Sequence, residues 1–148
     1  ILPKALTLTG VTASNKVYDA FTAAALSGGM LNGIVGSDNV TLTAGTGNFA
    51  DANVGTGKTV TASGFALGGT KAGNYSLAQP TGLSADITAR PITVSATAGN
   101  KVYDGTTAST LTPTITAGTL AAGESLSGLS QSYNSANVAN ATTLTAAV

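Results

Sequence analysis

An internal repeat limits what this chain can fold into more than any other feature. The string Asn-Lys-Val-Tyr-Asp at residues 15–19 recurs unchanged at residues 100–104. Flanking segments recur in the same order and at nearly the same offset of about 85 residues. The matched segments are 6–9 with 92–95, 49–54 with 133–138, and 58–62 with 142–146. This period exceeds the 20–50 residues of solenoid repeats and suits a small domain with its own core.

The repeat predicts two modules, one at residues 1–90 and one at residues 91–148. The second module has no counterpart of residues 64–89, so we expect it to be incomplete at its C-terminal end. Strands without partners would leave unpaired backbone groups along a sheet edge, and we expect strand-mediated self-association with a neighbouring chain there. The alternatives are partial disorder of the second copy and a module boundary at a different residue.

Alternation of apolar and small polar residues predicts short β-strands. Many short strands at 8–12-residue spacing favour an all-β fold of tandem, Ig-like, mostly antiparallel β-sandwich modules. The alternative is a β-grasp-like module with one short helix near residues 23–30. Asn32-Gly33 predicts a tight hairpin, and glycine-rich stretches predict turns. The expected strands are 5–9, 40–43, 59–62, 75–78 and 92–95, and the expected glycine turns are 45–47, 55–57 and 68–69.

The apolar faces of these strands, together with aromatic side chains, form the expected core. Phe49 and Tyr133 occupy matching positions in the two copies, as core residues would. The expected core residues are Phe49, Phe65, Tyr75 and Tyr133, with Leu6, Leu8, Val17, Val40, Leu42, Val60 and Leu77 around them.

Composition excludes several classes of function. The chain has no Cys and no His, which removes disulfides, thiolate metal sites and the usual general base. Six basic and six acidic residues argue against nucleic acid as a partner. No apolar run approaches the roughly 18 residues of a membrane span, so we expect no membrane insertion. Only Asp19 and Asp104 recur at one position, and one repeated acid per module argues against the pair of carboxylates that a glycosidase needs. The sequence also lacks clustered acids such as Asp-x-Asp-x-Asp-Gly, so we expect no enzymatic activity, no cofactor and no metal site.

The repeated lysine and tyrosine residues have structural interpretations. We expect Tyr18 and Tyr103 to bury their rings at a strand end and to bond backbone through their hydroxyl groups. We expect Lys16 and Lys101 to lie along the sheet with solvated amines. The alternative for the tyrosines is a stacking platform for a sugar.

The repeated aspartates are expected to cap a turn. In this interpretation the carboxylates of Asp19 and Asp104 each accept a hydrogen bond from the amide two residues on. The alternative roles are an acid catalyst or a calcium ligand. Ala20 follows Asp19 where Gly105 follows Asp104. We therefore expect the first turn to avoid positive φ, unless this part of the motif is dispensable.

Several segments together resemble a known repeat. They are Lys-Val-Tyr-Asp-Gly-Thr-Thr at 101–107, the Phe-Ala-Asp-Ala-Asn-Val-Gly-Thr-Gly-Lys segment at 49–58, Ala-Gly-Asn-Tyr-Ser-Leu at 72–77 and the Ala-Asp-Ile-Thr-Ala-Arg-Pro junction at 85–91. The chain resembles the YDG/MBG-type repeat of bacterial surface adhesins. Such repeats occur in large exoproteins of the filamentous haemagglutinin kind, which are exported by two-partner secretion. The resemblance covers essentially the whole chain.

The resemblance implies a function without a catalytic residue or a ligand. It implies a non-enzymatic structural or stalk module of a secreted, extracellular adhesin on a bacterial cell surface, supporting cell adhesion or biofilm formation. Its expected partners are the neighbouring repeat modules of the parent protein. The alternative is a module that itself binds a surface glycan or a host protein.

Overall fold

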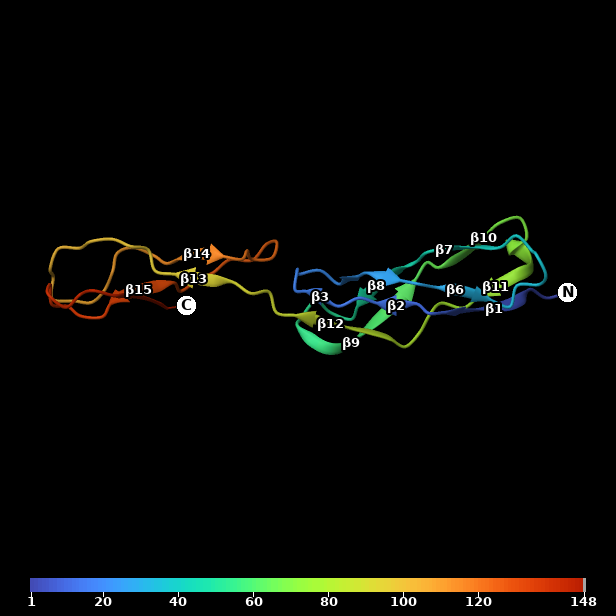
Figure 1. Ribbon diagram of the computed structural model, residues 1–148, viewed down its shortest axis with the longest axis horizontal. Helices are drawn as coiled ribbons and strands as arrows, with labels where there is room; N and C mark the ends of the chain where they lie inside the picture. The colour runs from blue at the N-terminus through green and yellow to red at the C-terminus, as the bar shows by residue number, and fades with distance from the viewer. Residues whose placement is uncertain (148) are drawn as a thin grey trace. The chain divides into compact units, whose positions relative to one another are not determined.

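The computed structural model describes residues 1–147 of the chain. It consists of two compact units, Ile1–Ala89 and Arg90–Val148, coloured blue to yellow-green and yellow to red in Figure 1. The division lies beside the repeat junction at residues 90–91. Regular structure in the described part is β-strand, apart from one short 3-10 turn. The all-β class that the alternation predicts is therefore confirmed.

The first unit is built from short strands joined by turns. Thr, Val, Leu and Ala alternate along them, which suits strands with one buried face. The elements are β1 (Lys4–Thr9), β2 (Thr12–Ala13), β3 (Lys16–Val17), β4 (Ala23–Ala24), β5 (Leu26–Ser27), β6 (Met30–Asn32), β7 (Thr41–Thr43), β8 (Thr46–Phe49), β9 (Gly55–Ser63), β10 (Ala66–Gly68), the 3-10 turn η1 (Ala72–Asn74), β11 (Tyr75–Leu77) and β12 (Leu83–Thr88).

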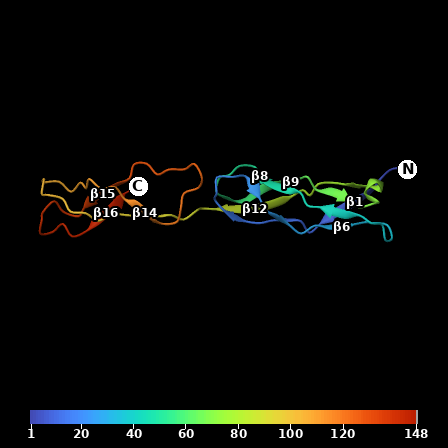
Figure 2. The ribbon, with the colours of Figure 1, turned by 90° about the horizontal axis from the view of Figure 1, so that it is seen from above.

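These strands form several sheets that pack together in a sandwich-like arrangement. The main sheet has the order β3-β12-β9-β8-β4, and a three-stranded sheet has the order β11-β1-β6. The pairs β10-β7 and β2-β5 complete the unit. Figure 2 shows β8, β9 and β12 at one end of the unit and β1 and β6 at the other. Pairing is mostly antiparallel, but β1 with β11 and β3 with β12 are parallel.

The core of the first unit lies on the main sheet. Phe49 on β8 is opposite Val60 on β9, which in turn is opposite Leu83 on β12. Ala85 and Ile87 complete the inward face of β12, and Ile87 is only 1% exposed. The buried residues of this cluster are Ala24, Phe49, Val60, Ala85 and Ile87. Elsewhere in the unit Leu6, Phe65 and Tyr75 are also buried.

Val17, which the sequence places in the core, is exposed. The reason is the register of β3. Lys16 points inward from this edge strand, as its hydrogen bonds show. Successive side chains of a strand point to opposite faces, so Val17 must point outward.

The helix expected near residues 23–30 is absent, and the segment forms β4, β5 and the start of β6 instead. Gly28 and Gly29 both adopt positive φ, which ends any regular element. A Cβ on Gly28 would lie 2.1 Å from the carbonyl oxygen of Gly10, so the chain approaches too closely there for another residue. The β-grasp alternative with a helix in this segment is therefore wrong.

Two other local predictions are wrong for similar reasons. Asn32-Gly33 does not form a hairpin, because β6 pairs with β1 rather than with the segment that follows it. Gly47, expected in a turn, is buried within β8. A Cβ on Gly47 would lie 2.8 Å from the side chain of Leu26. Glycine thus serves here for close packing rather than for chain reversal.

The second unit contains two strand pairs in its described residues. They are β13 (Thr93–Ser95) with β14 (Thr114–Ala117), and β15 (Ser130–Tyr133) with β16 (Leu144–Ala147). Its Tyr133 is half-buried. A loop contact of the first unit recurs here at the repeat offset. The amide of Phe49 donates to the Thr22 carbonyl, and that of Tyr133 donates to the Thr107 carbonyl, both at 2.8 Å.

Truncation of Phe49 tests the assigned core. Phe49 is 3% exposed, so Phe49→Ala should lower the free energy of unfolding of the first unit by about 3–5 kcal/mol. Phe21 is 60% exposed, and Phe21→Ala is the matched control, with an expected change within about 0.5 kcal/mol. Urea denaturation of both variants measures the difference. Equal unfolding midpoints would contradict the assignment.

Candidate functional site

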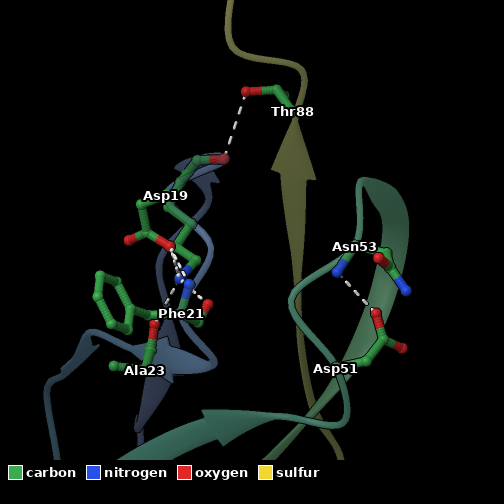
Figure 3. Close-up of polar contacts among 7 residues, drawn as sticks. Asp19, Phe21, Ala23, Asp51, Asn53 and Thr88 are labelled. Carbon is green, nitrogen blue, oxygen red and sulfur yellow. Dashed lines mark hydrogen bonds and ion pairs between the residues drawn. The ribbon is translucent and has the colours of Figure 1, made fainter. Parts of the chain in front are cut away.

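The repeated motif forms a turn organised around a lysine amine. The Nζ atom of Lys16 donates to Oδ1 of Asp19 at 2.7 Å and to the carbonyl oxygens of Phe21 and Ala23 at 2.6 and 3.0 Å. Figure 3 shows these groups converging beside the end of β12, where Thr88 bonds the Lys16 carbonyl. The Lys16 side chain is 17% exposed. We call this arrangement the lysine lock.

Asp19 supplies the negative charge of the lock and closes the turn. Its Oδ1 accepts a hydrogen bond from the Phe21 amide at 2.9 Å, the contact expected from the sequence. The hydrogen bond from Lys16, and then that from the Phe21 amide, lower the pKa of the Asp19 carboxyl. The carboxylate is therefore ionised and held by two donors, as in a capped turn.

The second unit repeats the lock with the same spacing. The Lys101 amine contacts Oδ1 of Asp104 at 2.7 Å and donates to the carbonyl oxygens of Thr106 and Ala108 at 2.9 and 2.8 Å. In each unit the partners are thus three, five and seven residues after the lysine. Hydrogen bonds from Lys101 and from the backbone and hydroxyl of Thr106 lower the pKa of Asp104 to about 2.

The expectation that Lys16 and Lys101 have solvated amines is wrong. Each amine is surrounded by a carboxylate and backbone carbonyl oxygens, and the side chains are 17% and 20% exposed. The physical reason is the chain reversal after Asp19 and Asp104, which turns carbonyl oxygens toward the lysine. An ammonium group has three donors and can satisfy all of them together. The Lys16 amine also lies 5.5 Å from the ring centroid of Phe49.

The lock joins the two edges of the main sheet. β3, which carries Lys16, is at one edge, and β4, which carries Ala23, is at the other. The Lys16 amine bonds the Ala23 carbonyl and so connects these edge strands directly. Edge strands present backbone groups without ladder partners, and this contact satisfies one of them.

Ala20 corrects a second expectation, because it adopts a φ of 69°. Gly105, at the equivalent position, has a φ of 77°. The turn after the aspartate therefore requires the left-handed region in both copies, and the sequence-based expectation that the first turn avoids it is wrong. The hydrogen bonds around Asp19 hold the alanine in a conformation that a Cβ disfavours.

The repeated tyrosines occupy different environments. Tyr18 is half-buried, packs against the core cluster, and donates its amide to the Thr88 carbonyl at 2.8 Å. Tyr103 is 62% exposed, so the expectation of a buried ring is wrong for the second copy. The difference follows from β12, which supplies Ala85 and Ile87 to the cluster beside Tyr18.

Sequence reasoning missed two further polar arrangements. The Tyr75 hydroxyl donates to Asp38 at 2.6 Å and accepts from the Val35 amide at 3.0 Å. The hydrogen bond to Asp38 raises the pKa of Tyr75. The Asp51 carboxylate accepts hydrogen bonds from the Lys58 amine at 2.5 Å and from the Asn53 amide at 2.8 Å. Figure 3 shows the contact between Asp51 and Asn53. Hydrogen bonds from these two donors lower the pKa of Asp51.

A buried glutamine in the second unit was also missed. Gln131 is buried, accepts from the Thr97 amide at 2.7 Å and donates to the Thr97 carbonyl at 2.8 Å. Gln79 bonds the amide and carbonyl of Phe65 in the same way. In both places a side-chain amide bonds one backbone residue as a neighbouring strand would. No local sequence pattern marks such a pair.

Ala20 and Gly105 share a left-handed backbone conformation, so exchanging alanine and glycine at these two positions should change stability in opposite directions. Ala20→Gly should raise the free energy of unfolding of the first unit by about 0.5–1 kcal/mol, because the relieved strain exceeds the entropy that glycine adds to the unfolded chain. Gly105→Ala should lower that of the second unit by a similar amount. A Cβ at Gly105 meets no atom within 4 Å, so only backbone strain changes. Thermal unfolding of both variants measures this, and shifts of the same sign would refute it.

Within residues 1–147 no group of three or more His, Cys, Asp or Glu side chains is placed to hold a metal ion. In the same part of the chain, no helix has the length and apolar character that crossing a membrane requires.

Comparison with known protein families finds the same repeat that the two lysine locks show. No curated protein and no solved structure matches the chain. The family model of the YDG domain matches residues 2–82 and again residues 88–148. These two matches cover most of the chain, and each contains one lysine lock. The chain therefore belongs to the YDG domain family, of which it holds two copies in tandem.

Proposed function

We propose that the two units are non-enzymatic structural repeats in the stalk of a secreted bacterial cell-surface adhesin. In this role they link and space other parts of the parent protein and support cell adhesion or biofilm formation. The proposal places them outside the cell, with neighbouring repeat modules as their partners. We further propose that the parent protein is an exoprotein of the filamentous haemagglutinin kind, which its sequence motifs resemble, and that it is exported by two-partner secretion.

The repetition of the lysine lock carries this proposal. The motif residues that recur with unchanged spacing are Lys16 with Asp19 and Lys101 with Asp104, and their charged groups bond one another and the local backbone. A charged group that bonds a charged partner and the backbone of its own module in this way contributes to the stability of the module. Repeats that share such a contact suit a protein in which the same module is used many times.

A second candidate function is binding of a glycan or a host protein. One observation favours it. Tyr103 is exposed and lines a groove of the second unit together with Asn100. An aromatic face beside an amide is the kind of surface on which a sugar ring can stack and bond.

A glycan array distinguishes the two functions. The 148-residue chain, applied to an array of bacterial and host glycans and to a panel of host surface proteins, should show no saturable binding if it is a stalk segment. Antibodies against the chain should also label intact cells of the source bacterium. The second candidate would be favoured by saturable binding that is lost in the Tyr103→Ala variant. That variant must keep the fold, and it leaves Tyr18 of the first unit unchanged.

A further inference from the structure

The second unit has a groove beside its lysine lock, with a volume of about 250 Å³. Residues from the repeated motif form one wall, and residues that follow β15 form the other. Its lining includes Asn100, Lys101, Tyr103, Tyr133, Val138 and Ala141. The lining contains both apolar and polar side chains.

The first unit shows what occupies the equivalent place. There β12 lies between β3, which it pairs in parallel, and β9, which it pairs antiparallel. Asn15, the counterpart of Asn100, accepts a hydrogen bond from the Asp86 amide at 2.8 Å. The ladder with β9 shifts register between Ala85 and Ile87, so the intervening Asp86 amide is directed to the asparagine instead.

The side chains that surround β12 in the first unit are more buried than their counterparts in the second unit. In the first unit Ala85 and Ile87 pack with Phe49, and Tyr18 lies against this cluster. Phe49 corresponds to Tyr133 of the second unit. There Tyr103 is 62% exposed, whereas its counterpart Tyr18 is half-buried. The Tyr103 ring is the side chain that a strand in the groove would cover.

We propose that this groove binds a β-strand with the pattern of β12, Leu-Ser-Ala-Asp-Ile-Thr. The bound strand runs parallel to residues 101–102 and antiparallel to residues 139–144. The amide of its Asp donates to Oδ1 of Asn100, and its Ala and Ile side chains cover Tyr133 and Tyr103. The pairing adds one strand beside β16, and residues 101–102 and 139–143, which lie outside the strands of the second unit, join the ladder on binding.

The occupant is an extended segment that is not already part of a folded unit. The β12 strand of a second copy is less suitable, because Ile87 is 1% exposed there and its withdrawal would open that copy's core. Self-association of the chain through this edge is therefore a competing outcome of the test. The inference does not depend on the proposed stalk function.

A peptide titration tests the site directly. The probe is a synthetic peptide of residues 81–90, Thr-Gly-Leu-Ser-Ala-Asp-Ile-Thr-Ala-Arg, added to the isotope-labelled 148-residue chain. Saturable shifts of the amide resonances of Asn100, Lys101 and Tyr103 are expected, with Asn15 and Lys16 unaffected because β12 already covers them. The control peptide carries Ile87→Asp and should cause none of these shifts.

An intramolecular version keeps the test decisive if the free peptide binds weakly. A copy of residues 65–90 is appended after Val148, which places the strand at the high effective concentration of a tethered ligand. Hydrogen exchange at residues 101–103 should then slow by at least about tenfold. The matched control is the same extension with Ile87→Asp in the appended copy.

Three results would overturn the inference. The first is unchanged exchange in the extended chain, or equal protection by the control extension. The second is a dimer of the 148-residue chain whose two copies exchange β12, which would make a second copy the occupant. The third is a glycan that binds at Tyr103 and is not displaced by the peptide or by the appended strand.

Discussion

A lysine ammonium group holding backbone carbonyl oxygens is the interaction on which both units depend. The chain reverses sharply after Asp19, and this reversal turns carbonyl oxygens of Phe21 and Ala23 away from any ladder partner but toward Lys16. An intramolecular hydrogen bond contributes about 0.5–1.5 kcal/mol to stability, and more when one partner is charged. One amine bonds both carbonyl oxygens, and the Asp19 carboxylate balances its charge. The same amine connects the two edge strands of the main sheet, so the turn and the sheet stabilise each other.

The strand β12 is the second element on which the first unit depends. It lies between β3 and β9 and carries Ala85 and Ile87 into the core cluster. It also receives the Tyr18 amide at its last residue, Thr88. A local turn motif near the start of the module is thus completed by a strand about 70 residues later in sequence. Contacts of such sequence separation join the two ends of the module, so it is not a set of independent hairpins.

Much of the architecture could be predicted from the sequence, because alternation and repetition are local and regular signals. The strand at residues 59–62, the capped turn at Asp19 and the burial of Phe49 all follow from such signals. The inward orientation of Lys16 could not be predicted, because a charged side chain suggests solvent until the carbonyl oxygens around it are known. The positive φ of Ala20 was missed for the same reason: tertiary contacts there override the preference of the residue. Pairs such as Tyr75 with Asp38 join distant segments and leave no pattern in the sequence.

The free energy of unfolding of a Lys16→Met variant tests the lysine lock most directly. Methionine keeps the length and apolar stem of the side chain but removes the three donors. The first unit should lose about 1–3 kcal/mol, whereas Lys4→Met, at the exposed start of β1, should change little. Urea denaturation of the two variants beside the unsubstituted chain gives the comparison. A Lys16→Met chain as stable as the Lys4→Met chain would contradict the account.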